Sequence, residues 1–171
     1  WVPACSTGEE AYTLAMVFLE ALQQMNVCKN FALQIFATDL DDEAIVKARA
    51  GLYPQNIVDD VSKVLLERYF VSVDTGYKVG KTVREMVIFA PQNLVMDPPF
   101  TKVDILSCRN LLIYLETDLQ KKLFPLFHYS LNPAGVLVLG TAETVSNETK
   151  LFTSLPGKQR IYRRHDNLFP V

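Results

Sequence analysis

Apolar residues recur along the chain in two alternating patterns, which predict strands followed by helices. A short apolar run at Trp1–Ala4 leads into a loop of small residues, and apolar residues then recur at helical spacing from Glu9 to Met25. The same succession returns when a buried-strand run at 31–38 precedes a helix from about 43 to 50 that ends at Gly51. Repeated strand–helix units predict an α/β fold with a mostly parallel sheet.

The second half of the chain continues this alternation after one interruption. A helix is predicted at 62–70, and short alternating strands at 70–73, 77–79 and 86–89 predict a small antiparallel β subdomain inserted at about 70–89. The remaining predicted elements are a loop at 93–100, a strand at 103–107, a helical segment at 111–115, a helix at 117–131 kinked at Pro125, a stop at 132–135, a strand at 136–140, a mixed helix and loop at 142–155 and a closing strand at 158–164.

The loop before the first helix is the first candidate site. In an open parallel sheet, such a strand–helix junction faces the ligand crevice. A loop that binds a dinucleotide uses several glycines and places a diphosphate at the helix amino terminus. Here Gly8 is the only glycine, and the carboxylates of Glu9 and Glu10 would repel a diphosphate. The loop therefore favours a cationic, phosphate-free nucleoside such as S-adenosylmethionine, although the two glutamates could instead only complement the helix dipole.

Polar side chains also follow the later strands of the predicted sheet. Asp39 ends the strand at 31–38, about one helix and one strand after the glycine loop, which is the usual position of a carboxylate that binds ribose hydroxyls. A plain helix cap would be Asp41 or Asp42 and leaves Asp39 without a role. Arg109 and Asn110 end the strand at 103–107, and we expect them to face the same crevice.

Composition and charge exclude several classes of protein. The 171 residues predict a single domain over 1–171, and 17 basic against 19 acidic residues give a net charge of −2, which disfavours a nucleic-acid partner. Cys5, Cys28 and Cys108 form neither a disulfide framework nor a metal pattern, so we expect no metal and a reducing, cytoplasmic location. No apolar run approaches the roughly 20 residues of a membrane span, so membrane insertion is not expected.

Seven segments of the chain occur in the order in which one protein family carries them. They are Cys5-Ser-Thr-Gly-Glu-Glu-Ala-Tyr12, Phe36-Ala-Thr-Asp-Leu-Asp41, Ala50-Gly-Leu-Tyr53, Arg68-Tyr-Phe70, Asn93-Leu94, Cys108-Arg-Asn-Leu-Leu-Ile-Tyr114 and Gly140-Thr-Ala-Glu143. Together they closely resemble the catalytic domain of CheR, the chemotaxis receptor methyltransferase family, over nearly the whole chain. Several segments look most like the versions fused to CheB-type methylesterase and sensor domains.

The resemblance implies a fold, a reaction and partners. The fold is a doubly wound, Rossmann-like methyltransferase sheet with a small inserted antiparallel β subdomain. The reaction is transfer of a methyl group from S-adenosylmethionine to glutamate side chains on the helical cytoplasmic part of chemoreceptors, with S-adenosylhomocysteine as product. Family members also carry an amino-terminal helical domain that is absent from this chain, so activity of this stretch alone is an open question.

The resemblance also implies which residues form the site. Arg109 and Tyr114 are expected to orient the acceptor as catalytic residues, with the alternatives that Arg109 holds cofactor or pairs with Glu9. A glutamate carboxylate has an unperturbed pKa of about 4.3, so at neutral pH it needs no general base. His128 is therefore interpreted as structural. The residues implied to bind the cofactor are Ala4, Ser6, Thr7, Gly8, Glu9, Asp39, Leu40, Asn93, Leu94, Arg109 and Asn110.

Two other interpretations remain open. One is an S-adenosylmethionine-binding domain that has lost activity and serves as a sensor or interaction module in a multidomain signalling protein. The other is a nicotinamide-dependent oxidoreductase, which the single glycine and the paired glutamates disfavour. The segment Asp97-Pro-Pro-Phe100 resembles the Asp-Pro-Pro-Tyr motif of adenine amino-group methyltransferases. That motif ends a strand in those enzymes but precedes one here, and together with the acidic balance of the chain this disfavours a nucleic-acid substrate.

Overall fold

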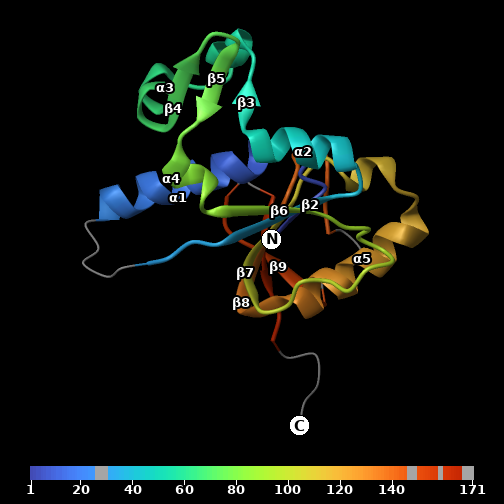
Figure 1. Ribbon diagram of the computed structural model, residues 1–171. Coiled ribbons are helices and arrows are strands. Elements are labelled where there is room, and N and C mark those ends of the chain that lie inside the picture. Colours follow the sequence, from blue (N-terminus) through green and yellow to red (C-terminus); the bar gives the residue numbers. More distant parts are fainter. Residues whose placement is uncertain (26–30, 146–149, 158–159, 167–171) are drawn as a thin grey trace. The chain divides into compact units, whose positions relative to one another are not determined.

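The computed structural model describes residues 1–25, 31–145, 150–157 and 160–166, and it divides into two compact units (Figure 1). Unit 1 comprises Trp1–Ala4 together with Asn93–Val171, and unit 2 comprises Cys5–Gln92. Each unit is a set of residues that contact one another more than they contact the other unit. The prediction of one domain over residues 1–171 stays a prediction.

The α/β part of unit 2 consists of two strand–helix units. Its elements are α1 (Glu9–Met25), β2 (Ile35–Asp39), α2 (Asp42–Ala50) and β6 (Val87–Pro91). Strand β2 pairs in parallel with β6, with Ile35 opposite Val87. Figure 1 shows α1 and α2 over the same face of this pair, and the hydroxyl of Tyr12 on α1 donates to the carbonyl of Ala48 on α2 at 2.7 Å. Both helix predictions are therefore confirmed.

The strand predicted at 31–38 differs in its bounds. Strand β2 begins at Ile35 and runs to Asp39, and residues 31–34 have no regular structure. The strand can extend only as far as its partner, and β6 begins at Val87 opposite Ile35. The apolar pattern of 31–34 was compatible with a strand, but a strand also needs a neighbour to accept its backbone hydrogen bonds.

Helix α2 has a capping residue at each end. The side chain of Asp41 accepts hydrogen bonds from the backbone N–H of Glu43 at 2.8 Å and of Ala44 at 3.2 Å. Gly51 closes the other end in the left-handed conformation, and its N–H bonds to the carbonyls of Ala48 and Lys47. Since Asp41 caps the helix, Asp39 is left for another role, as the sequence indicated.

The β subdomain exists, but its predicted bounds of 70–89 are wrong. Three antiparallel strands form it in the order β3 (Leu52–Tyr53), β5 (Gly76–Val79) and β4 (Phe70–Val73). Helix α3 (Lys63–Tyr69), capped by Ser62, lies beside β4, and a 3-10 turn, η1 (Gln55–Asp59), precedes it (Figure 1). The segment 86–89 instead belongs to β6, because helix α4 (Lys81–Arg84) separates it from β5 and leads it back to β2.

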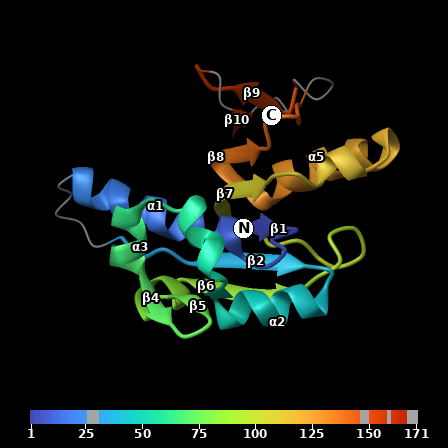
Figure 2. The same cartoon turned by 90° about the horizontal axis from the view of Figure 1, so that it is seen from above.

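Unit 1 is built on a mixed sheet. Its strand order is β7 (Val103–Cys108), β8 (Leu131–Leu139), β10 (Ile161–Arg164) and β9 (Phe152–Ser154), labelled in Figure 2. Strands β7 and β8 are parallel, and the pairings of β10 with β8 and β9 are antiparallel. The amino-terminal strand β1 (Val2–Pro3) lies against β7, where the N–H of Ser107 donates to the carbonyl of Trp1 at 2.9 Å.

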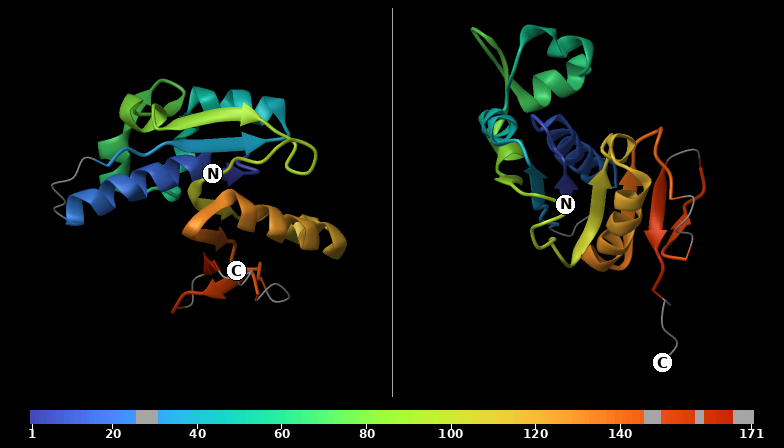
Figure 3. Two further views of the ribbon diagram at one scale, coloured as in Figure 1. Left: turned by 90° about the horizontal axis from the view of Figure 1, so that it is seen from below. Right: turned by 90° about the vertical axis from the view of Figure 1, so that its right-hand side faces the viewer.

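Helix α5 (Thr117–Ser130) lies against β8, as Figure 3 shows, and contains Pro125 as predicted. The 3-10 turn η2 (Leu112–Tyr114) precedes it at the place of the predicted helical segment. Phe127 on α5 and Leu137 on β8 are fully buried in the core of the unit. His128 bonds through Nε2 to the carbonyl of His165 at 2.7 Å and packs edge-on against the ring of Phe152, which agrees with a structural role.

Two predictions in unit 1 differ from the structure. The stop predicted at 132–135 lies inside β8, which begins at Leu131 directly after α5. Pro133 is tolerated there because the pairing with β7 shifts register between Val103 and Ile105, and a proline fits where the hydrogen-bond ladder is interrupted. The described residues of 142–155 form turns and β9 and contain no helix, while residues 146–149 and 158–159 of the predicted elements lie outside the described residues.

Candidate functional site

The loop between Cys5 and α1 is a closed turn. The N–H of Cys5 donates to the carbonyl of Thr38 at 2.9 Å, and the N–H of Gly8 donates back to the carbonyl of Cys5 at 2.9 Å. Ser6 and Gly8 have positive φ angles of 48° and 93°. The turn therefore leads directly into α1, which begins at Glu9.

Glycine is the residue type that fits position 8 of this turn. A Cβ atom built on Gly8 would lie 3.0 Å from the Cβ of Ala48 and 3.0 Å from Cζ of Phe89. Its backbone conformation also disfavours every residue with a side chain. The glycine thus lets the loop pack directly onto α2 and β6.

Asp39 holds the loop from the end of β2. Its Oδ2 atom accepts the N–H of Ser6 at 2.7 Å, and its Oδ1 atom accepts the N–H of Asp41 at 3.0 Å. The structure therefore brings two predicted cofactor residues, Ser6 and Asp39, into direct contact. A carboxylate has about four lone-pair positions, so Asp39 keeps acceptor capacity for ligand hydroxyls. Beside it, Leu40 exposes 70% of its surface and offers an apolar contact.

The surroundings of the loop are acidic. Burial raises the pKa of the Cys5 thiol to about 12, and the nearby carboxylates of Asp39, Glu10 and Glu9 contribute to the same rise in pKa. Thr7 donates its hydroxyl to the carboxylate of Glu9 at 2.7 Å. Three acidic side chains thus act on one buried atom at the start of α1, and this arrangement favours a cation over a phosphate.

We expect the Cys5 thiol to resist alkylation in the folded protein. With a pKa of about 12, its thiolate fraction at about pH 8 is roughly 10³-fold below that of an unfolded cysteine. Because the thiolate is the nucleophile, alkylation of the folded protein slows accordingly. Iodoacetamide labelling followed by peptide mass spectrometry measures this, with the protein in guanidinium chloride as the reference. Native labelling of Cys5 as fast as in the denaturant would show that the loop is open.

Tyr53 contacts the loop, although sequence reasoning did not single it out. Its hydroxyl donates to the carbonyl of Thr7 at 2.8 Å from strand β3. Burial and the carboxylate of Glu9 raise the pKa of this phenol, so the hydroxyl keeps its proton. The only signal for this role was the place of Tyr53 in the segment Ala50-Gly-Leu-Tyr53, since the contact joins residues far apart in the chain.

The other predicted site residues belong to unit 1. Arg109 and Asn110 follow β7 and are exposed, and Tyr114 exposes 79% of its surface on η2. A hollow of about 580 Å³ in this unit is lined in part by the side chains of Arg109 and Arg160. Two guanidinium groups beside one hollow suit a carboxylate ligand.

The pair Asn93-Leu94 forms a turn of its own. The side-chain oxygen of Asn93 accepts the N–H groups of Val95 at 3.0 Å and Met96 at 3.1 Å, and its own N–H donates to Asp97 at 2.7 Å. Leu94 is half-buried. The predicted site residues therefore fall into two sets. The loop residues from Ser6 to Glu9, with Asp39 and Leu40, belong to unit 2, and unit 1 contains Ala4, Asn93, Leu94, Arg109, Asn110 and Tyr114. A crevice shared by both sets stays a prediction.

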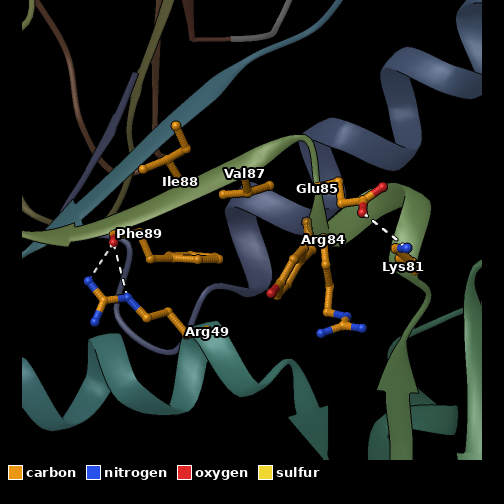
Figure 4. Close-up of a pocket in the computed structure, with 8 residues that line it drawn as sticks. Arg49, Lys81, Arg84, Glu85, Val87, Ile88 and Phe89 are labelled. Atoms are coloured by element: carbon orange, nitrogen blue, oxygen red, sulfur yellow. Dashed lines mark hydrogen bonds and ion pairs between the residues drawn. The ribbon is translucent and has the colours of Figure 1, made fainter.

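A second hollow, of about 460 Å³, lies in unit 2 and is shown in Figure 4. The guanidinium group of Arg49 donates from Nε and Nη2 to the carbonyl of Phe89 at 3.1 and 2.8 Å, and Lys81 pairs with Glu85 at 3.6 Å. Arg84 donates to the carbonyl of Val79 at 3.0 Å. None of the predicted site residues lines this hollow, and its two arginines tie α2 to β6 and α4 to β5.

The residues that the structure describes also bear on metal sites and membrane spans. Among those residues, no group of three or more His, Cys, Asp or Glu side chains is placed to hold a metal ion. The helices in that part of the chain are too short or too polar to cross a membrane. Cys5 and Cys108 are buried and are not joined in a disulfide, and Cys28 lies outside the described residues.

Comparison with known proteins gave one family and several relatives. The family model described as "CheR methyltransferase, SAM binding domain" matches residues 1–161. The chain is 37% identical over 163 residues to an uncharacterized 104.1 kDa protein of Rhodobacter capsulatus, covering 95% of this chain and 17% of that protein. It is 32% identical over 159 residues to a chemotaxis protein methyltransferase of Borreliella burgdorferi, covering 91% of this chain and 56% of the relative.

A solved structure of a TehB-like SAM-dependent methyltransferase from Corynebacterium glutamicum has a similar fold. The TM-score is 0.52 at 12% sequence identity, and the match covers 96% of this chain and 79% of that structure. At this identity the likeness concerns the fold alone, and it confirms the predicted methyltransferase-type α/β fold.

Proposed function

Because the chain belongs to the CheR methyltransferase family, we propose that it binds S-adenosylmethionine and transfers the methyl group to glutamate side chains of chemoreceptors. The observation that carries this proposal is the carboxylate of Asp39, held 2.7 Å from the N–H of Ser6 in an acidic loop. The chain spans 17% and 56% of the two relatives described above, so activity, substrate and partners belong to the proposal.

The residues of the loop fit the methyl donor. Asp39 has free acceptor positions for the ribose hydroxyls, and the exposed side chain of Leu40 beside it can pack against the adenine ring. The carboxylates of Glu9 and Glu10 suit the positive sulfonium and amino groups. When bound, the donor supplies an electrophilic methyl group on sulfur, and its transfer to a carboxylate oxygen leaves neutral S-adenosylhomocysteine.

The acceptor needs orientation more than activation. A glutamate carboxylate is already ionised at neutral pH, so no side chain has to remove a proton. Arg109 and Arg160 line one hollow of unit 1 and can hold such a carboxylate through charge-assisted hydrogen bonds. Holding the acceptor in near-attack geometry can supply on the order of 7 to 11 kcal/mol of the barrier. The exposed hydroxyl of Tyr114 is the second group assigned to this task.

The partners and location follow from the same family. The protein substrate is the helical cytoplasmic part of a chemoreceptor, which places the enzyme in the cytoplasm. The fusion to methylesterase or sensor domains is proposed from the sequence resemblance alone.

Transfer of a labelled methyl group tests the proposal. The purified protein is incubated with methyl-labelled S-adenosylmethionine and a receptor cytoplasmic fragment, and a matched fragment with its candidate glutamates changed to alanine is the control. We expect label in the first fragment only, released as methanol by alkali because the product is a carboxyl ester. Binding of S-adenosylhomocysteine without any transfer would support the inactive sensor domain instead.

A further inference from the structure

Glu143 is a buried acidic residue whose role the proposed reaction does not yet include. Its side chain is 3% exposed, and its carboxylate accepts three backbone hydrogen bonds. Oε2 accepts the N–H of Gly140 at 2.7 Å and of Asn110 at 3.0 Å, and Oε1 accepts the N–H of Leu112 at 2.7 Å. A carboxylate is the side chain that accepts on both oxygens and donates on neither, so it matches three converging donors.

These three donors lie in the two segments that follow the neighbouring strands β7 and β8. Cys108 ends β7 opposite Leu139 of β8, so Asn110 and Gly140 both lie just past the ends of a parallel pair. Glu143 therefore links the segment after β7 to the segment after β8. Gly140 leaves the room for this link, because a Cβ there would lie 2.6 Å from Oδ1 of Asn110 and 2.7 Å from Oε2 of Glu143.

The segment that Glu143 holds is one that needs to be held. Asn110 has a φ of 59°, a left-handed conformation that costs energy for a residue with a side chain. Its neighbour Arg109 is exposed and is one of the residues that line the 580 Å³ hollow of unit 1. The backbone around Arg109 is thus fixed by a buried charge, and not by contacts of the arginine side chain alone.

We propose that Glu143 is a positioning residue, which acts through Arg109 by fixing the turn from Arg109 to Leu112. This inference rests on the proposed function for the role of Arg109 and on the geometry of unit 1 for the turn. Removing the charge breaks at least one of the three hydrogen bonds, because a glutamine amide places an N–H₂ group against a backbone N–H.

The test uses Glu143→Gln, which keeps the side-chain volume, and Glu116→Gln as the matched control at an exposed glutamate of the same unit. Both are made in the wild-type and the Arg109→Ala backgrounds of the purified protein, and kcat and KM for methyl transfer are measured. We expect Glu143→Gln to lower kcat by about 10²-fold in the wild type, since a misplacement of about 1 Å has that effect, and by less than about threefold in Arg109→Ala. Equal losses in both backgrounds would mean a general structural role and would overturn the inference.

A second readout does not depend on catalysis. Hydrogen–deuterium exchange of the amides of Asn110, Leu112 and Gly140 reports the three hydrogen bonds directly. We expect exchange in this turn to be about 10-fold faster in Glu143→Gln and unchanged in Glu116→Gln. Faster exchange together with no methyl transfer by the unmodified protein would reject the proposed function and retain the turn-fixing role. Unchanged exchange would reject the role itself.

Discussion

Replacement of Asp39 by alanine weakens binding of S-adenosylhomocysteine by about 100-fold, because a charged acceptor contributes about 1.5 to 3 kcal/mol through its hydrogen bonds. The change also removes the acceptor of the Ser6 N–H, so the loop loses the contact that orients it toward the ligand. Isothermal titration calorimetry with the product measures the effect. The product is the suitable probe because it binds without turning over.

The control for this prediction is Asp42→Ala. Asp42 is the first residue of α2, is exposed, and has no part in the loop. It tests whether loss of any acidic side chain near Asp39 is enough to weaken binding of S-adenosylhomocysteine. A dissociation constant for Asp39→Ala within threefold of the wild-type value would mean that the cofactor is bound elsewhere, and the proposed site would have to be abandoned.

Replacement of Gly8 by alanine lowers the free energy of unfolding by about 2 to 6 kcal/mol. A positive φ at a residue with a side chain costs about 1 to 3 kcal/mol, and forcing a methyl group to within 3.0 Å of Ala48 and Phe89 adds about 1 to 3 kcal/mol. Urea unfolding followed by circular dichroism measures the loss. Product affinity should fall with it, since the new methyl group displaces the loop from α2 and β6.

A second substitution separates the two causes. Phe89→Leu removes the ring atoms Cζ and Cε1 that approach Gly8. In that background we expect Gly8→Ala to cost about 1 kcal/mol less than in the wild type, because the crowding by the Phe89 ring is relieved while the contact with Ala48 and the backbone strain remain. A change of less than about 0.5 kcal/mol for Gly8→Ala alone would show that the loop adjusts freely and that its shape is not fixed by the glycine.

Whether a residue's role could be predicted from the sequence depends on how far along the chain its hydrogen-bond partners lie. Asp41 and Gly51 were identifiable as caps because a cap bonds to backbone groups within four residues of itself. Asp39 could be assigned to a ligand by elimination, but its hydrogen bond to Ser6 joins residues 33 positions apart. Tyr53 and Glu143 were not singled out from the sequence beyond their places in two of the seven segments. The contact of Tyr53 with Thr7 spans 46 positions, and the contacts of Glu143 with Asn110 and Leu112 span 33 and 31.

The sequence by itself determined the helices α1 and α2, the strand–loop–helix junction at Gly8, the acidic character of the loop and the family of the chain. Local periodicity, capping chemistry and short segments in order are enough for these, because each depends on residues close together in the chain. Only the tertiary structure decided that residues 87–91 pair in parallel with β2 and that Leu52–Tyr53 completes the β subdomain. An alternating apolar pattern buries one face of a strand equally well against several partners, so the partner is chosen by the fold as a whole.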